Sequence, residues 1–114
     1  DEPVILNIAE GFLRECGYNV MSAAGAVRGI EIFAREHSGI SAVMIDLSMP
    51  EKTGIEVFQE LKKIDPGVRA VLSSGMLDSD LKDKALKMGV RETLKKPYLA
   101  AELSMIMKSV TSGD

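Results

Sequence analysis

Hydrophobic residues along this chain follow two patterns that alternate. In five segments they recur every three or four residues, which is the spacing of an amphipathic helix. Between these segments lie four short runs that are expected to form strands, and the apolar run over 42–45 is typical of a buried strand. The expected helices cover residues 4–16, 27–34, 54–64, 77–88 and 99–110, and the expected strands cover residues 18–23, 42–45, 69–72 and 92–95.

This alternation, with its short connections, predicts an α/β protein built around a parallel sheet. Parallel strands need crossover connections, which are right-handed and place helices on both faces of the sheet. Gly17, Gly89 and the sequence Asp65-Pro66-Gly67 stop helices where the pattern requires a turn. The chain has 114 residues and no internal repeat, so we expect one domain over residues 1–114, with residues 112–114 as a tail.

The beginning of the chain departs from the alternation. Val4, Ile5 and Ile8 open a helical stripe that ends at Gly17, so the first expected element is a helix. The preceding Asp1-Glu2-Pro3 is typical of a loop that follows a strand. We therefore expect the first strand of a five-stranded, doubly wound sheet to be missing from the chain.

Composition is ordinary for a globular protein and argues against several classes of function. Hydrophobic residues make up 46% and the formal net charge is −3, which gives no general argument for binding nucleic acid or an anionic membrane. No apolar run approaches the roughly 20 residues that span a bilayer. Cys16 is the only cysteine and lies on the apolar face of the first expected helix, so no internal disulfide forms and a reducing cytoplasm is expected.

Polar residues stand where three of the expected strands end. Asp46, the sequence Ser73-Ser74-Gly75 and the sequence Lys96-Pro97 each follow one of the expected strands. The carboxyl ends of parallel strands lie along one edge of the sheet, where open α/β sheets bind ligands. A carboxylate, a hydroxyl and an ammonium group that meet there form a site for a phosphoryl group. Taken alone, each of these is an ordinary turn or strand-end residue.

Together with the acidic start of the chain, these motifs resemble the receiver domains of two-component response regulators. The matching motifs are Asp1-Glu2-Pro3, Asp46 with Met49-Pro50 and Gly54, Ser74-Gly75, and Lys96-Pro97-Tyr98. Each is weak alone, but their order and their places at strand ends make the resemblance specific, and it covers essentially the whole chain. It implies a flavodoxin-like receiver fold, a doubly wound parallel sheet with strand order 2-1-3-4-5.

The resemblance also implies roles for individual residues. Asp46 matches the aspartate that accepts a phosphoryl group from a histidine kinase or a histidine phosphotransfer protein. Ser74 and Lys96 match the hydroxyl and the ammonium group that bind the phosphoryl oxygens. Asp1, Asp46 and the backbone carbonyl of Ser48 match the ligands of Mg²⁺, for which Mn²⁺ is an alternative. The first acidic residue of the family's acidic pair has no counterpart in this chain.

Three further positions match structural or switching positions of the family. Gly75 matches the small residue after the hydroxyl, and Pro97 matches a proline whose preceding peptide bond is usually cis. Thr93 is a departure, because many family members carry an aromatic residue there that turns inward on phosphorylation. A threonine does not reproduce the burial of that ring.

Two neighbouring residues compete with the matched ones. Ser73 precedes Ser74, and alternation along a strand is expected to turn Ser73 to the other side. Lys95 precedes Lys96, and the following Pro97 favours Lys96 as the phosphoryl-binding residue.

The expected function is a phosphorylation-controlled switch rather than an enzyme. The change would be read on the surface of the helix over 77–88, the last strand and the closing helix, by an output domain or protein that the sequence does not identify. A phosphorylation-dependent dimer is a candidate assembly, and neither nucleic acid nor a membrane is an expected partner. The sequences Ser73-Ser74-Gly75 and Lys96-Pro97-Tyr98 resemble those of receivers attached to hybrid sensor kinases.

Two other functions remain open on the sequence. The first is a pseudo-receiver, an interaction module that works without phosphorylation, and the incomplete acidic pair and Thr93 favour it. The second is an enzyme or cofactor binder on the same architecture, such as a flavin carrier. No glycine-rich phosphate loop follows a strand, and aromatic residues are only 4% of the chain, so nothing in the sequence supports the second.

Overall fold

The computed structural model of this protein describes residues 4–8, 19–23, 25–46, 54–75 and 79–111. The strands in these ranges are β1 (Val4–Ile8), β2 (Asn19–Ser22), β3 (Ala42–Asp46), β4 (Ala70–Ser74) and β5 (Glu92–Lys95). The helices are α1 (Ala26–Glu36), α2 (Gly54–Ile64), α3 (Ser79–Met88) and α4 (Ala100–Thr111), with a short 3₁₀ turn (His37–Gly39) after α1.

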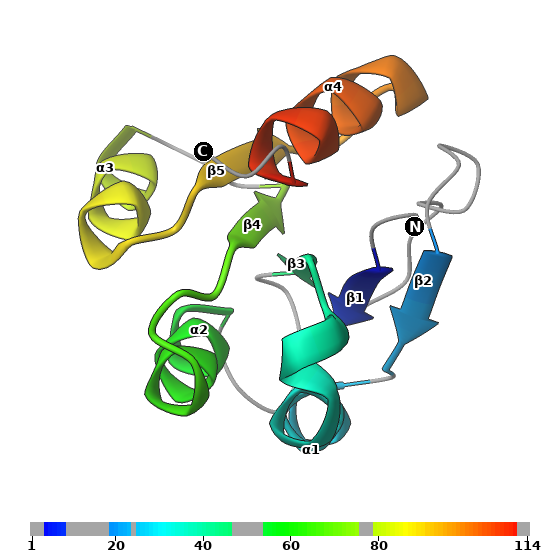
Figure 1. The fold of residues 1–114 in the computed structure, drawn as a ribbon. Helices are drawn as coiled ribbons and strands as arrows, with labels where there is room; N and C mark the ends of the chain where they lie inside the picture. The colour runs from blue at the N-terminus through cyan, green and yellow to red at the C-terminus, as the bar shows by residue number, and fades with distance from the viewer. Residues whose placement is uncertain (1–3, 9–18, 24, 47–53, 76–78, 112–114) are drawn as a thin grey trace.

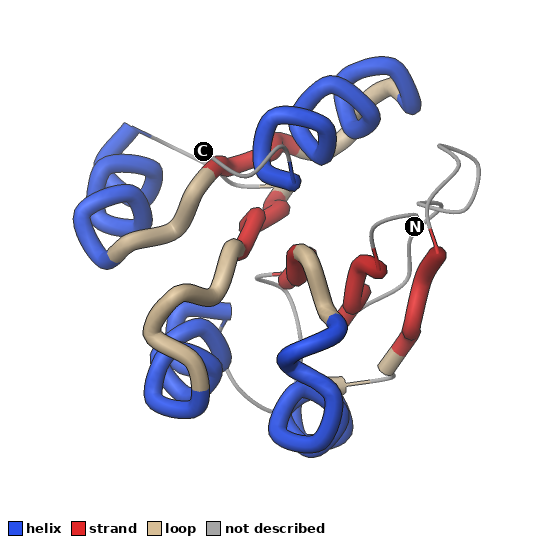
Figure 2. Tube along the Cα trace, in the orientation of Figure 1, coloured by secondary structure: helices blue, strands red, loops and turns tan. Residues whose placement is uncertain are grey.

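The strands form one parallel sheet in the order β2-β1-β3-β4-β5 (Figure 1). α1 and α2 cover one face of this sheet, and α4 covers the other (Figure 2). A sheet with helices on both faces and this strand order is the predicted doubly wound fold, so the predicted fold class is confirmed.

The start of the chain forms a strand where the sequence pattern predicted a helix. β1 pairs with β2 on one side and with β3 on the other. The predictions of a helix beginning at Val4 and of a missing first strand are therefore wrong. The physical reason is burial on both faces. Residues 5–8 are at most 2% exposed, and a short apolar run suits a central parallel strand as well as it suits a helix. Cys16 lies outside the described residues.

The other predicted helices and strands are confirmed, with ends that differ by a few residues. β4 runs to Ser74, so both of its serines belong to the strand and not to the turn after it. α3 is followed by Gly89 at φ +111°, a left-handed conformation that favours glycine at a helix end. α2 is followed by Asp65, whose carboxylate accepts a 3.0 Å hydrogen bond from the Gly67 N–H and so forms the predicted turn.

Two clusters of buried side chains hold the helices to the sheet. α1 and α2 pack Phe33 and Phe58 against one face. α4 packs Leu103 against Met44 and Val71 on the other face. Because residues two apart in a strand share a face, these clusters assign every strand residue to one side of the sheet. None of the helices in the described ranges is both long and apolar enough to cross a membrane.

Candidate functional site

The carboxyl ends of β3, β4 and β5 bring three predicted site residues to one edge of the sheet. Asp46 is the last residue of β3, and Ser74 is the last residue of β4. Lys96 directly follows β5, and its N–H donates a 2.8 Å hydrogen bond to the carbonyl oxygen of Ser74. The fold thus gathers residues that lie as many as 50 positions apart in the sequence.

Asp46 and Lys96 contact each other directly at this edge. The Lys96 Nζ donates a hydrogen bond to Asp46 Oδ2, and the two side chains form an ion pair. The Asp46 side chain is 13% exposed and that of Lys96 is 35% exposed, so the carboxylate is the more deeply buried partner. The peptide bond between Lys96 and Pro97 is cis, as the family resemblance implied. The predicted meeting of Asp46 with Lys96 is confirmed, and the chemistry of the pair stays a prediction.

The two serines of β4 relate to Asp46 differently from the sequence prediction. Ser73 is the register partner of Asp46, and in-register residues of parallel strands project from the same face of the sheet. The expectation that Ser73 turns to the other side is therefore wrong. Ser74 is 7% exposed, lies one residue nearer the end of β4 and pairs with Lys95. Counting positions across the sheet from Asp46 would have identified Ser73 as its neighbour.

The hydroxyl of Ser73 is buried without a hydrogen-bond partner in the described part of the chain, which is unusual. The residue is 1% exposed. Most buried side-chain hydroxyls in folded proteins do have a partner. A buried donor next to the predicted phosphoryl acceptor is a feature that sequence reasoning missed.

The predicted metal ligands lie mostly outside the described residues. This holds for Asp1 and Ser48, which leaves Asp46 as the one predicted ligand within them. Across the described part of the chain, no group of three or more His, Cys, Asp and Glu residues is placed to hold a metal ion. The placement of Asp1 beside Asp46 rested on a strand that precedes Asp1, whereas β1 begins after it. The fold therefore adds no support to that ligand.

Two further predicted positions lie within the described residues. Gly75 is exposed, and a Cβ added to it would meet no atom within 4 Å, so packing does not require a glycine there. Thr93 is 8% exposed and is the register partner of Leu72. The departure from the family's aromatic residue thus falls at a buried position of β5.

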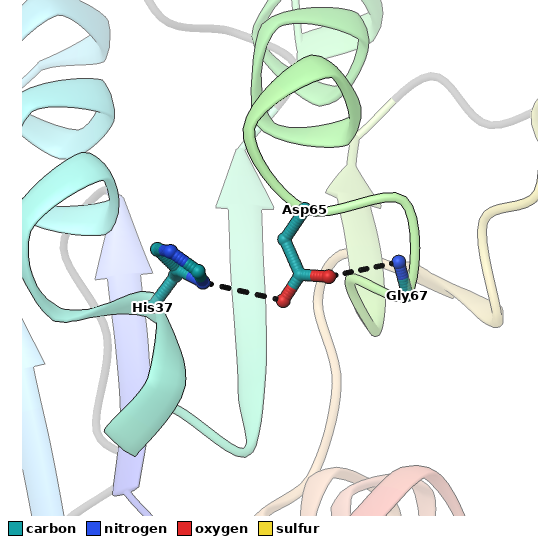
Figure 3. Close-up of polar contacts among 3 residues, drawn as sticks. All are labelled: His37, Asp65 and Gly67. Carbon is teal, nitrogen blue, oxygen red and sulfur yellow. Dashed lines mark hydrogen bonds and ion pairs between the residues drawn. The ribbon is translucent and has the colours of Figure 1, made fainter.

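The only histidine lies at the opposite edge of the sheet, at the amino ends of β3 and β4. His37 follows α1, and its Nδ1 lies 3.5 Å from Oδ2 of Asp65 at the end of α2 (Figure 3). A cavity of about 160 Å³ opens beside this pair, between α1 and the start of β4. His37 is therefore separated from Asp46 by the length of β3.

An open parallel sheet binds ligands at its carboxyl edge, and in this chain that edge carries a carboxylate paired with a lysine. The family model of the response regulator receiver domain matches residues 1–108, and the chain belongs to this family. It is a receiver domain of two-component signalling, in a family of regulatory phospho-acceptor domains rather than classical enzymes.

Three known proteins illustrate the likeness. The probable transcriptional regulator ycf27 of Porphyridium aerugineum is 34% identical over 110 residues, which are 96% of this chain and 45% of that protein. A response regulator receiver domain protein from Clostridium thermocellum has a TM-score of 0.88 at 28% identity, with 96% of this chain and 94% of that chain covered. The receiver domain of the sensor histidine kinase PA1611 from Pseudomonas aeruginosa PAO1, solved with a magnesium ion coordinated in its active site cleft, has a TM-score of 0.85 at 19% identity, with 99% and 100% covered. The chain thus spans less than half the length of the curated relative.

Proposed function

We propose that the protein accepts a phosphoryl group on Asp46 from a histidine kinase or a histidine phosphotransfer protein. The observation that carries the proposal is the ion pair between Asp46 and Lys96 at the carboxyl edge of the sheet. A carboxylate becomes a useful nucleophile when a neighbouring cation reduces the repulsion from an incoming phosphoryl group. The alternative is a pseudo-receiver that binds partners without being phosphorylated.

In the proposed reaction, a carboxylate oxygen of Asp46 attacks the phosphorus of a phosphohistidine. The bond from phosphorus to the imidazole nitrogen breaks, and the nitrogen leaves with the electron pair. The Lys96 ammonium group stays within reach of the product oxygens because its stem is anchored at the end of β5. Ser74 is the last residue of β4 and so lies at the carboxyl edge itself, where its hydroxyl donates to a phosphoryl oxygen in the proposed product. The product carries roughly −1.5 to −2 charge at a site that held one carboxylate.

We propose that Mg²⁺ binds beside Asp46, with Mn²⁺ as an alternative ion. A partly buried carboxylate at the end of a strand is the kind of oxygen ligand that Mg²⁺ prefers. The backbone carbonyl of Ser48 is a further proposed ligand. Asp1, the other ligand that the resemblance implies, needs a direct test because β1 begins after it. When bound, the ion offsets the charge that develops as the carboxylate and the phosphoryl group approach each other. Asp1→Asn is expected to weaken Mg²⁺ binding, and an unchanged affinity would remove Asp1 from the ligand set.

The proposed output of the switch is a changed surface over α3, β5 and α4. Ser74 belongs to the strand that precedes α3, so a hydroxyl drawn toward a phosphoryl group acts on the start of that helix. Because Thr93 takes the place of the family's aromatic residue, we assign the change to β4 and α3 rather than to an inward-turning ring. A phosphorylation-dependent dimer is one proposed readout, and a cytoplasmic location is part of the same proposal.

The test is the intact mass of the purified protein before and after treatment with acetyl phosphate and Mg²⁺. We expect a gain of one phosphoryl group, and no gain for Asp46→Asn. Ser109→Ala, on the exposed side of α4, is the matched control for a change of similar size away from the site. A gain that persists in Asp46→Asn would assign acceptance to another residue. No gain in the parent protein would favour the pseudo-receiver.

A further inference from the structure

We propose that Ser73 is a second hydroxyl donor to the phosphoryl group on Asp46, in addition to Ser74. The proposal rests on the proposed function of Asp46 as phosphoryl acceptor. It assigns to Ser73 a role that neither the motif match nor the alternation along β4 suggested. The observations that carry it are the register of the sheet, the burial of Ser73 and the unpaired state of its hydroxyl.

The register of the sheet places Ser73 beside Asp46. Ser73 and Asp46 are partners across β3 and β4, and neighbouring strands lie about 4.8 Å apart. Asp46 lies two positions after Met44 in β3, and Ser73 lies two positions after Val71 in β4. Met44 and Val71 belong to the buried cluster on the face of the sheet that α4 covers. Asp46 and Ser73 therefore project from the same face of the sheet. A phosphoryl group on Asp46 brings its oxygens to the side where the Ser73 hydroxyl lies.

The surroundings of Ser73 offer its hydroxyl nothing else to bond in the described part of the chain. On the other side of β4, its register partner is Leu94 in β5. The preceding residue on the same face is Val71, and Leu103 of α4 packs over that face. An apolar side chain would suit this position better than serine, because a buried hydroxyl without a partner is unfavourable.

Because the Ser73 hydroxyl is unpaired in the described part of the unmodified protein, it should favour the phosphorylated form. A group shifts an equilibrium only when it interacts differently with the two states. The Ser73 hydroxyl lacks a partner among the described residues before phosphorylation and gains a charged acceptor after it. Loss of the hydroxyl should therefore weaken the binding of a phosphoryl-like group and leave the stability of the unmodified protein unharmed.

The experiment measures the affinity for beryllofluoride, a stand-in for the phosphoryl group, by calorimetric titration in the presence of Mg²⁺. We expect Ser73→Ala to bind it about threefold to tenfold more weakly than the parent protein, the effect of one hydrogen bond. Its unfolding temperature should be equal to that of the parent or higher. Ser73→Thr, which keeps the hydroxyl, should restore most of the affinity.

Val71→Ala is the matched control, because it removes buried atoms from the same face of the same strand without removing a polar group. It should lower the unfolding temperature and leave the affinity within about twofold. Equal affinities for Ser73→Ala and the parent would overturn the proposal. A Ser73→Ala variant that is destabilised and weakened in step with Val71→Ala would also overturn it, because the serine would then be structural. Asp46→Asn should not bind. A parent protein that gains no phosphoryl mass would overturn the proposed function and this inference together, whereas normal mass gain with unchanged affinity overturns Ser73 alone.

Discussion

Replacing Lys96 by methionine tests how much the ion pair with Asp46 contributes to the fold. Methionine keeps an unbranched stem and removes the ammonium group, so the change is mainly one of charge. The Asp46 side chain, only 13% exposed, would then lose this cation as a partner. We expect Lys96→Met to be less stable than the parent and to hold a phosphoryl group less well.

The burial of the two partners sets the magnitude. Exposed ion pairs contribute about 0–1 kcal/mol, whereas removing one partner of a fully buried pair costs about 3–5 kcal/mol. With side chains that are 13% and 35% exposed, the pair lies between these limits and nearer the first. We expect a loss of about 1–2 kcal/mol for Lys96→Met. For a chain of this size, that lowers the unfolding temperature by about 4–8 °C.

The assay is urea denaturation of the parent, Lys96→Met, Asp46→Asn and the double variant. If the loss comes from an uncompensated carboxylate, Asp46→Asn should relieve it, with a coupling energy of about 1 kcal/mol between the two changes. Lys95→Met, one position earlier and more exposed, is the matched control and should be near neutral. A coupling energy below about 0.3 kcal/mol would refute the reasoning, because the two side chains would then act independently.

Three further predictions concern packing and helix ends. Gly29→Ala should destabilise the fold by about 1–2 kcal/mol in urea denaturation, because the added Cβ would meet Ile8 Cγ1 at 2.7 Å. This overpacking outweighs the gain in helix propensity. A gain in stability would contradict the placement of β1. Lys62→Met should lower the free energy of unfolding by about 0.5–1 kcal/mol, because it removes the 2.7 Å hydrogen bond from Nζ to the Met88 carbonyl. Amide exchange in the last turn of α3 should become faster, and unchanged exchange would argue against the contact. Gly89→Ala should lower the unfolding temperature through strain at φ +111°, and an equal temperature would show that this turn relaxes freely.

The sequence predicted most of the fold because its signals are long or repeated. β3 and β4 begin as apolar runs, and α2 combines a helical stripe with a strong stop at Asp65-Pro66-Gly67. The segment 4–8 lacked such a signal, since Val4, Ile5 and Ile8 satisfy a helical spacing and a short buried strand equally well. What decides between them is the vacancy that a central strand fills between β2 and β3, which is a property of the whole sheet.

The site could be predicted where it depends on strand ends, and not where it depends on register. Asp46 and Lys96 meet because parallel strands share one edge, and this follows from the fold class alone. The position of Ser73 beside Asp46 depends on how β3 and β4 are aligned, and a shift of one residue would exchange it with Ser74. Alignment between strands is set by packing on both faces, which the pattern within one strand does not encode.

The contacts of Lys62 have a mechanical consequence for the proposed switch. Its ammonium group holds the last carbonyl of α3, and the Gly89 and Val90 N–H groups also bond back into that helix end. Lys62 thus joins the last residue of α3 to α2 by one exposed hydrogen bond, while the start of α3 at Ser79 comes after the strand that carries both serines. In the proposed switch, a change at the carboxyl edge of the sheet would therefore displace the start of α3 more than its end at Met88. On phosphorylation, a change in amide exchange that is larger at the start of α3 than in its last turn would be the signature of this arrangement.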